Sequence, residues 1–283
     1  AIPLIETGAA DAFKLNDQHL ALACASHEGA AAHTEIVSKW IKGLGYTDSD
    51  FQCGPQRSRD VETRNALFEI GQEPCRIHNN CSGKHSGFLT TCQHLNVDLN
   101  YVDPDHVVQR NILAAFEDMT QETSPGFGID GCSAPNFACS LRGLATAMAR
   151  MADPVGLGAA RQAAATDLVA AMKAHPDLVA GEGRACTQLM EAMANRTVVK
   201  TGAEGVFIAI LPDRGLGVAL KVEDGATRAS ECAMATLLVR LGVLDAAHPA
   251  AVARMSPKQF NFAGLEVGRI APAADLFEGG ARI

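Results

Sequence analysis

The chain has 283 residues, of which 47% are hydrophobic and 20% are charged, a composition that excludes a largely disordered protein and allows a large core. Its net charge of −8 and the lack of a dense lysine and arginine stripe argue against nucleic acid as a partner, because basic clusters supply most of the affinity for a phosphate backbone. No apolar run reaches the roughly 18 residues of a membrane span, and residues 1–6 lack the basic region and cleavage pattern of a secretory signal, so we expect a cytoplasmic protein with no membrane partner.

Helical periodicity dominates the first two thirds of the sequence. Residues 33–44 place Ile36, Val37, Trp40 and Ile41 at the spacing of one helix face, with polar residues between them. Similar patterns predict further helices over residues 86–94, 104–119, 136–151, 159–174 and 184–193. Together these segments predict a helical lobe.

The pattern changes after residue 195, where short runs rich in β-branched residues predict strands. These runs are residues 197–200, 205–211 and 217–222. The Pro-Asp-Arg-Gly turn between the last two predicts an antiparallel hairpin, and the pattern of residues 227–241 predicts a helix on that sheet. Because no Pro-, Gly- or Ser-rich stretch divides the chain, we expect one α/β (α+β) domain over residues 1–283.

The chain carries nine cysteines, an odd number that cannot all pair as disulfides. In a chain of this length reduced thiols are the default expectation. Most of them are expected to be small buried hydrophobic residues. This group comprises Cys24, Cys92, Cys139, Cys186 and Cys232.

The segment 79–85 (Asn-Asn-Cys-Ser-Gly-Lys-His) is a strong candidate for a functional site. It lies between a polar pair and a predicted helix, where free backbone N–H groups and the positive helix end stabilise a thiolate or a carboxylate. The alternative is structural, because Ser-Gly before a helix is common capping composition.

A second polar turn, residues 130–136, also comes before a predicted helix and holds Asp130 and Cys132. If the two turns face each other, Cys81 and Cys132 could bind a soft cation such as zinc, completed by His85 or by a deprotonated Lys84. Two cysteines about fifty residues apart are weak evidence on their own. The alternative is that Asp130 caps its turn and Cys132 packs in the core.

The tripeptide Lys200-Thr201-Gly202 follows a predicted strand and precedes a hairpin and a helix. It resembles the Lys-Thr-Gly element of serine β-lactamases and penicillin-binding proteins, where the lysine lies on an edge strand beside a serine and the following backbone can bind an oxyanion. The Ser-x-x-Lys nucleophile of those enzymes is absent, which disfavours a β-lactamase or peptidase. Ser26, in a polar segment after an apolar stretch, offers another catalytic hydroxyl, and the alternative for Lys200 is an exposed strand lysine.

A series of motifs in one order resembles the rhizobial-type L-asparaginases over nearly the whole chain. The matching segments are residues 4–11, 24–27, 81–85, 130–132, 200–205, 224–228 and 264–270. The resemblance implies hydrolysis of L-asparagine to L-aspartate and ammonia on a fold like that of serine β-lactamases, penicillin-binding proteins and glutaminases, with an antiparallel sheet and a helical lobe. It also implies a homodimer.

The same resemblance implies roles for individual residues. Ser26, Lys200 and Asp130 would be catalytic, and His85 and Asn80 would bind substrate. A zinc ion would be held by Cys81, Lys84 and Cys132.

One departure from the family keeps a second reading open. Family members carry an N-terminal segment with a Ser-x-x-Lys motif before the stretch that matches residues 1–4, and we expect this chain to lack it. The alternative function is therefore a catalytically impaired protein that binds an amino acid or zinc on the same scaffold.

Overall fold

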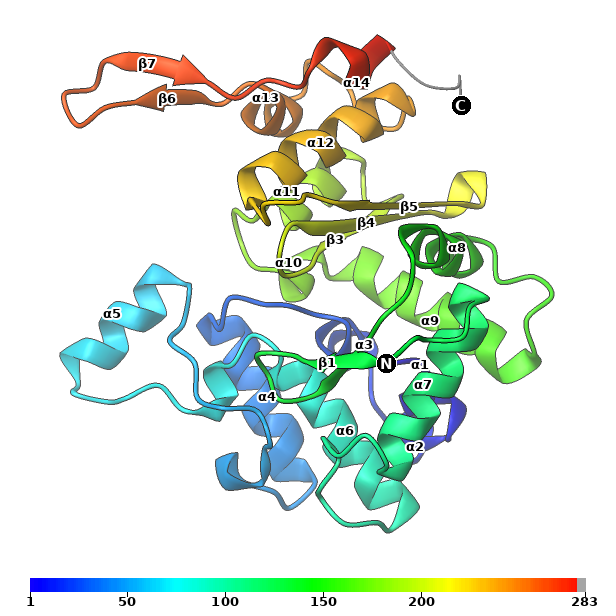
Figure 1. Ribbon diagram of the computed structural model, residues 1–283. Coiled ribbons are helices and arrows are strands. Elements are labelled where there is room, and N and C mark those ends of the chain that lie inside the picture. Colours follow the sequence, from blue (N-terminus) through cyan, green and yellow to red (C-terminus); the bar gives the residue numbers. More distant parts are fainter. Residues whose placement is uncertain (279–283) are drawn as a thin grey trace.

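The computed structural model describes residues 1–278, in which a helical lobe lies beside a three-stranded antiparallel sheet (Figure 1). The strands run in the order β3 (Val198–Thr201), β4 (Val206–Leu211) and β5 (Leu216–Lys221). Helix α8 (Leu141–Ala152) packs on one face and α12 (Thr227–Arg240) on the other. Strand β3 is therefore an edge strand between two helical layers, and its Lys200 pairs with Ile208 of β4.

The helical lobe is built mainly from segments that precede the sheet in the chain. Its helices are α1 (Ile2–Glu6), α2 (Ala9–Ala12), α3 (Asp17–Ala23), α4 (Ala31–Gly43), α5 (Val61–Glu69), α6 (Ser82–Leu95), α7 (Val107–Thr120) and α9 (Ala159–Ala174). Two more, α10 (Pro176–Val179) and α11 (Ala185–Ala192), connect the lobe to β3. Short 3₁₀ turns occur at Asp48–Asp50, Arg76–His78 and Pro212–Arg214.

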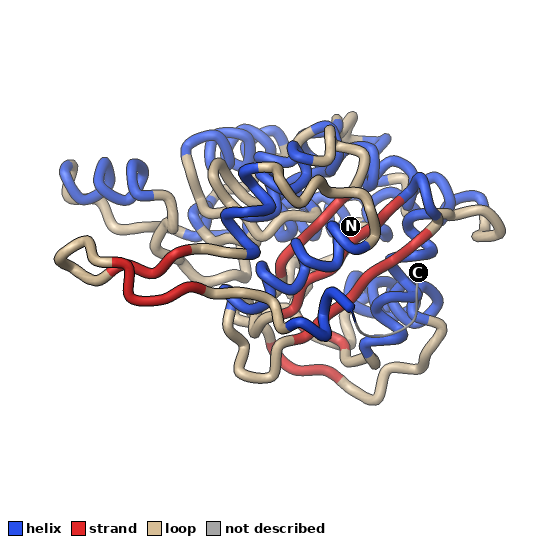
Figure 2. The backbone as a smooth tube through the Cα atoms, turned by 90° about the horizontal axis from the view of Figure 1, so that it is seen from above, coloured by secondary structure: helices blue, strands red, loops and turns tan. Residues whose placement is uncertain are grey.

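The remaining described elements lie outside the lobe and the sheet. Helix α13 (Pro249–Met255) packs on α12, and α14 (Ala274–Glu278) does the same. Strands β6 (Lys258–Phe260) and β7 (Glu266–Arg269) form a hairpin that projects from the body, as does α5 on the same side (Figure 1, Figure 2). Strands β1 (Phe127–Ile129) and β2 (Pro135–Phe137) form a second small hairpin.

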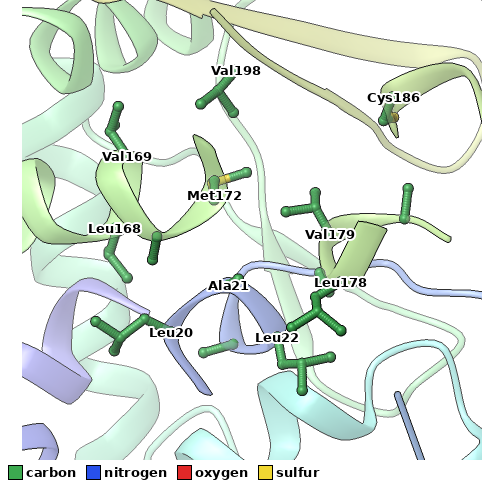
Figure 3. Packing of buried hydrophobic residues seen from close by; sticks show 14 of the residues in the cluster. Leu20, Ala21, Leu22, Leu168, Val169, Met172, Leu178, Val179, Cys186 and Val198 are labelled. Atoms are coloured by element: carbon green, nitrogen blue, oxygen red, sulfur yellow. The ribbon is translucent and has the colours of Figure 1, made fainter. Parts of the chain in front are cut away.

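The core joins α3 to the helices that lead toward the sheet. Leu20 and Leu22 of α3 lie beside Leu168 and Met172 of α9, with Val179 of α10 next to them (Figure 3). These side chains are buried, and burying each contributes about 1.5–3 kcal/mol. Because α3 ends at Ala23, this packing fixes the chain just before the predicted catalytic serine.

One glycine brings the sheet and α8 unusually close together. A Cβ at Gly217 of β5 would lie 2.2 Å from the amide nitrogen of Ala149 and 2.3 Å from the carbonyl oxygen of Ala145. Both are backbone atoms of α8, which cannot move aside as a flexible side chain would. The absence of a side chain at Gly217 is thus a condition of the packing.

Gly217→Ala is therefore expected to lower the free energy of unfolding by about 1–3 kcal/mol, the usual cost of overpacking. Urea unfolding followed by circular dichroism measures this loss. Gly128→Ala is the matched control, because no atom lies within 4 Å of a Cβ at that β1 position. Equal midpoints for the two variants would contradict the close packing of β5 on α8.

The structure confirms the mixed helical and antiparallel organisation and corrects several boundaries. The helix predicted over residues 136–151 begins only at Leu141, because Ser140 caps it by accepting a hydrogen bond from the Gly143 amide at 2.9 Å. Residues 135–137 instead form β2. The helix predicted over 86–94 begins at Ser82, so the residues from Ser82 to His85 lie inside its first turn rather than before it.

Three further observations bear on the predicted organisation. Helices α1, α2, α3 and α5 had no counterpart in the sequence prediction. No helix within residues 1–278 is long and apolar enough to cross a membrane. The predicted domain of residues 1–283 extends beyond the described residues at 279–283.

Candidate active site

Ser26 lies in a short extended connector between α3 and α4, where it reaches the edge of the sheet. Its hydroxyl Oγ lies 2.9 Å from Nζ of Lys200, which projects from β3. Its backbone N–H donates to the carbonyl of Val179 at 3.1 Å. The core packing of α3 and α10 thus places a half-buried serine against the lysine predicted to serve it.

The environment of Lys200 favours the neutral amine. Burial lowers the pKa of Lys200 below its ordinary value, and the charge of Lys84 lowers it further, against the opposing effect of the Cys186, Cys81 and Cys24 thiols. A neutral lysine amine can accept a proton from a hydroxyl. The pair therefore has the geometry and the direction of pKa shift that a nucleophile and its base require.

The backbone that follows Lys200 is already engaged in hydrogen bonds. The Thr201 N–H donates to Cys186 Sγ at 3.3 Å, and the Gly202 N–H donates to the carbonyl of Val206 at 2.7 Å. These two groups are therefore not free to bind an oxyanion. The part of the Lys-Thr-Gly interpretation that assigned this role to the backbone is wrong for this conformation.

Cys81, Asp130 and Cys132 form a cluster of possible metal ligands at the start of α6. Cys81 is the N-cap residue of α6, and the ligand atoms of these three residues all lie within 4.8 Å of one another. Lys84 Nζ lies 3.1 Å from Cys132 Sγ. The two turns that were 48 residues or more apart in the chain therefore do face each other, as the zinc hypothesis required.

The two thiols of this cluster share one proton. The hydrogen bond from Cys132, with help from the Lys84 and Lys200 charges, lowers the pKa of Cys81 to about 6, although burial and Asp130 oppose this. The same hydrogen bond, together with burial, raises the pKa of Cys132 to about 12. Near neutral pH, Cys81 is therefore a thiolate that accepts from the Cys132 thiol.

Lys84 and Asp130 complete the charge pattern of the cluster. Burial lowers the pKa of Lys84, but the Cys81 and Cys132 thiols and Asp130 outweigh it, so the pKa is raised overall. Partial burial opposes ionisation of Asp130, but hydrogen bonds from Cys132 and the Lys84 charge lower its pKa. The Cys132 N–H donates to Asp130 Oδ2 at 3.2 Å, so Asp130 caps its own turn and faces the cluster at once.

Comparison with known proteins places the chain in a family. A model of the family described as L-asparaginase II matches residues 1–272. The chain belongs to the L-asparaginase II family. This confirms the resemblance and the prediction of an L-asparaginase-type enzyme. Among curated proteins, none gives a significant match.

The two residues predicted to bind substrate lie at different depths in this L-asparaginase II family member. His85 is fully buried, and its Nδ1 lies 3.0 Å from Tyr101 Oη. Asn80 is half-buried, its N–H donates to Gln56 Oε1 at 3.0 Å, and its carbonyl accepts from the His27 N–H at 3.1 Å. Their role in substrate binding stays a prediction.

Several residues around the site were not singled out by the sequence. Tyr101 also accepts a hydrogen bond from the Gln52 N–H at 2.7 Å, so its own proton is available to His85. Cys186 touches the backbone beside Lys200 although it was expected only to pack. His27 bonds to Ser82 at 3.1 Å. The only available signal was the position of His27 beside Ser26.

Proposed function

We propose that this protein hydrolyses L-asparagine to L-aspartate and ammonia, with Ser26 as nucleophile and Lys200 as its base. The observation that carries the proposal is the 2.9 Å contact between the Ser26 hydroxyl and the buried Lys200 amine, in a chain of the L-asparaginase II family. A fold like that of the serine β-lactamases and glutaminases is part of the same proposal. It is supported by the edge-strand position of Lys200.

The reaction follows from these groups as acyl transfer. Lys200 accepts the Ser26 proton while Oγ attacks the side-chain amide carbon, and the C–N bond then breaks. The proton held by Lys200 goes to the departing nitrogen, which leaves as ammonia. Water, deprotonated by the same amine, attacks the ester and releases aspartate from Ser26.

The cluster at the start of α6 fits a zinc ion by its donor chemistry. Two thiols, an amine and a carboxylate in close proximity match the ligands that zinc prefers. Cys81, Lys84 and Cys132 would hold the ion, with Asp130 beside it. When bound, zinc would supply positive charge that orients the carboxylate of the substrate, which we favour over activation of water because thiolate and amine ligands donate strong charge to the metal.

Zinc binding is expected to release protons, because every ligand must bind in its deprotonated form. At neutral pH, Cys81 already lacks its proton, since its pKa is about 6. Cys132, with a pKa of about 12, and Lys84 must each lose one. The apparent zinc affinity should therefore rise by about two decades per pH unit just above neutrality and more steeply below pH ~6.

Isothermal titration calorimetry in buffers of different ionisation enthalpy measures this proton release. The Cys139→Ala variant is the control, because Cys139 is a half-buried thiol in the same segment but outside the cluster. A zinc affinity independent of pH would contradict this ligand set.

The proposed activity is tested by mixing purified, zinc-loaded protein with L-asparagine and measuring ammonia and L-aspartate. We expect equal amounts of the two products. L-glutamine in place of L-asparagine compares the two amide substrates. Calorimetric binding of L-asparagine without release of ammonia would instead favour an amino-acid-binding protein on this scaffold.

A further inference from the structure

The connector that carries Ser26 is tied to the first turn of α6 by its next residue, His27. The His27 N–H donates to the carbonyl of Asn80 at 3.1 Å. The His27 ring reaches the same turn through Nε2, which lies 3.1 Å from Ser82 Oγ. Backbone and side chain of one residue thus hold Ser26 against the turn of Cys81.

The hydrogen bonds of the ring fix which nitrogen carries the proton. Nδ1 accepts from the Gly29 N–H at 3.1 Å, so in the neutral ring Nε2 carries the hydrogen and donates it to Ser82. The ring is fully buried and stacks on His33, with centroids 4.7 Å apart and planes inclined by 9°. Burial and the neighbouring His33 lower the pKa of His27 well below its ordinary value. A charged donor is thereby excluded.

The turn that receives this bond cannot move away from the connector. Ser82 is fully buried and its N–H donates to the carbonyl of Asn79 at 2.9 Å. A Cβ on the next residue, Gly83, would lie 2.4 Å from the carbonyl oxygen of Leu22 in α3. Helix α6 therefore touches the helix that leads into Ser26, and His27 closes the gap on the other side of that serine.

We propose that His27 is a positioning residue that sets the distance between Ser26 and Lys200 by donating a hydrogen bond to Ser82. It touches neither substrate nor the reacting atoms and acts only through the connector. The inference rests on the proposed function for its effect on turnover. Its effect on the connector itself is independent of any activity.

The test compares His27→Leu, which removes the donor, with His27→Gln, which keeps an N–H donor at about the same reach. Steady-state ammonia release from L-asparagine gives kcat and KM. Amide hydrogen exchange at Ser26 and His27 reports whether the bonds to Val179 and Asn80 persist. Thr91→Val is the matched control, because it also removes a buried hydroxyl from α6, one that bonds only within the helix.

For His27→Leu we expect a loss in kcat of about tenfold to a hundredfold, the usual effect of a lost buried hydrogen bond, with KM changed less than about threefold. Exchange at the two amides should accelerate by a similar factor. His27→Gln should recover most of both, and Thr91→Val should match the unaltered protein. Adding Ser82→Ala to His27→Leu should cause little further loss, because both remove the same bond.

The inference is overturned if His27→Leu leaves exchange at both amides unchanged, if glutamine rescues nothing, or if the His27 and Ser82 losses simply add. These outcomes are separable from a failure of the proposed function. If the unaltered protein releases no ammonia, the asparaginase proposal fails, while accelerated exchange in His27→Leu with rescue in His27→Gln still supports the positioning role.

Discussion

Replacing Lys200 by methionine is expected to lower kcat for asparagine hydrolysis by about a hundredfold to ten-thousandfold, the range that a positioned general base contributes. Methionine keeps most of the length and apolar character of the side chain, so β3 can retain its pairing with β4. What is lost is the amine 2.9 Å from the Ser26 hydroxyl. The serine then has no neighbouring group to accept its proton, and KM should change little.

The matched control for this variant is Lys221→Met. Lys221 lies on β5 of the same sheet but is exposed and far from Ser26 in the strand order. Ammonia release by both variants, with folding checked by circular dichroism, completes the comparison. Normal turnover in Lys200→Met would remove Lys200 from the mechanism.

The second large effect is expected at the metal cluster. Cys132→Ala removes one thiol ligand and the hydrogen-bond donor that lowers the pKa of Cys81, and it leaves Lys84 without its 3.1 Å sulfur partner. Since loss even of a supporting residue costs ten- to a hundredfold in metal affinity, loss of a ligand should cost at least about a hundredfold. Competition with a chromophoric chelator measures this affinity.

Cys139→Ala again serves as control, because its thiol lies outside the cluster. Thermal unfolding provides a second readout, since a ligand that binds only the folded state raises its stability according to its affinity. Zinc should raise the melting temperature of the control but not of Cys132→Ala at the same concentration. An equal rise in both proteins would contradict the assignment of Cys132 as a ligand.

Periodicity and strand composition predicted the helical lobe and the sheet because those signals are local. They could not reveal α1, α2 and α3, which are too short to show a helical period over several turns. The helix predicted from residue 136 was misplaced because its alanine-rich pattern extends back past Ser140, whereas the true start is decided by a single cap. Boundaries that depend on one hydrogen bond are not visible in periodicity.

The site shows the same division between local and long-range information. The Cys81 and Lys200 segments were recognisable from their composition and neighbouring elements. That Ser26 reaches Lys200 across 174 positions of sequence, and that Cys132 reaches Lys84 across 48, is decided by packing of α3, α10 and β3. The roles of His27 and Tyr101 depend entirely on such contacts, so no sequence pattern announced them.

The most direct test of the proposed chemistry is to find the covalent intermediate. Protein mixed with L-asparagine is quenched in acid within the first turnover, digested and mapped by mass spectrometry. The proposed mechanism predicts a β-aspartyl ester on Ser26, formed with one equivalent of ammonia and absent from Ser26→Ala. Release of ammonia with the acyl group on another residue, or undiminished turnover by Ser26→Ala, would contradict it.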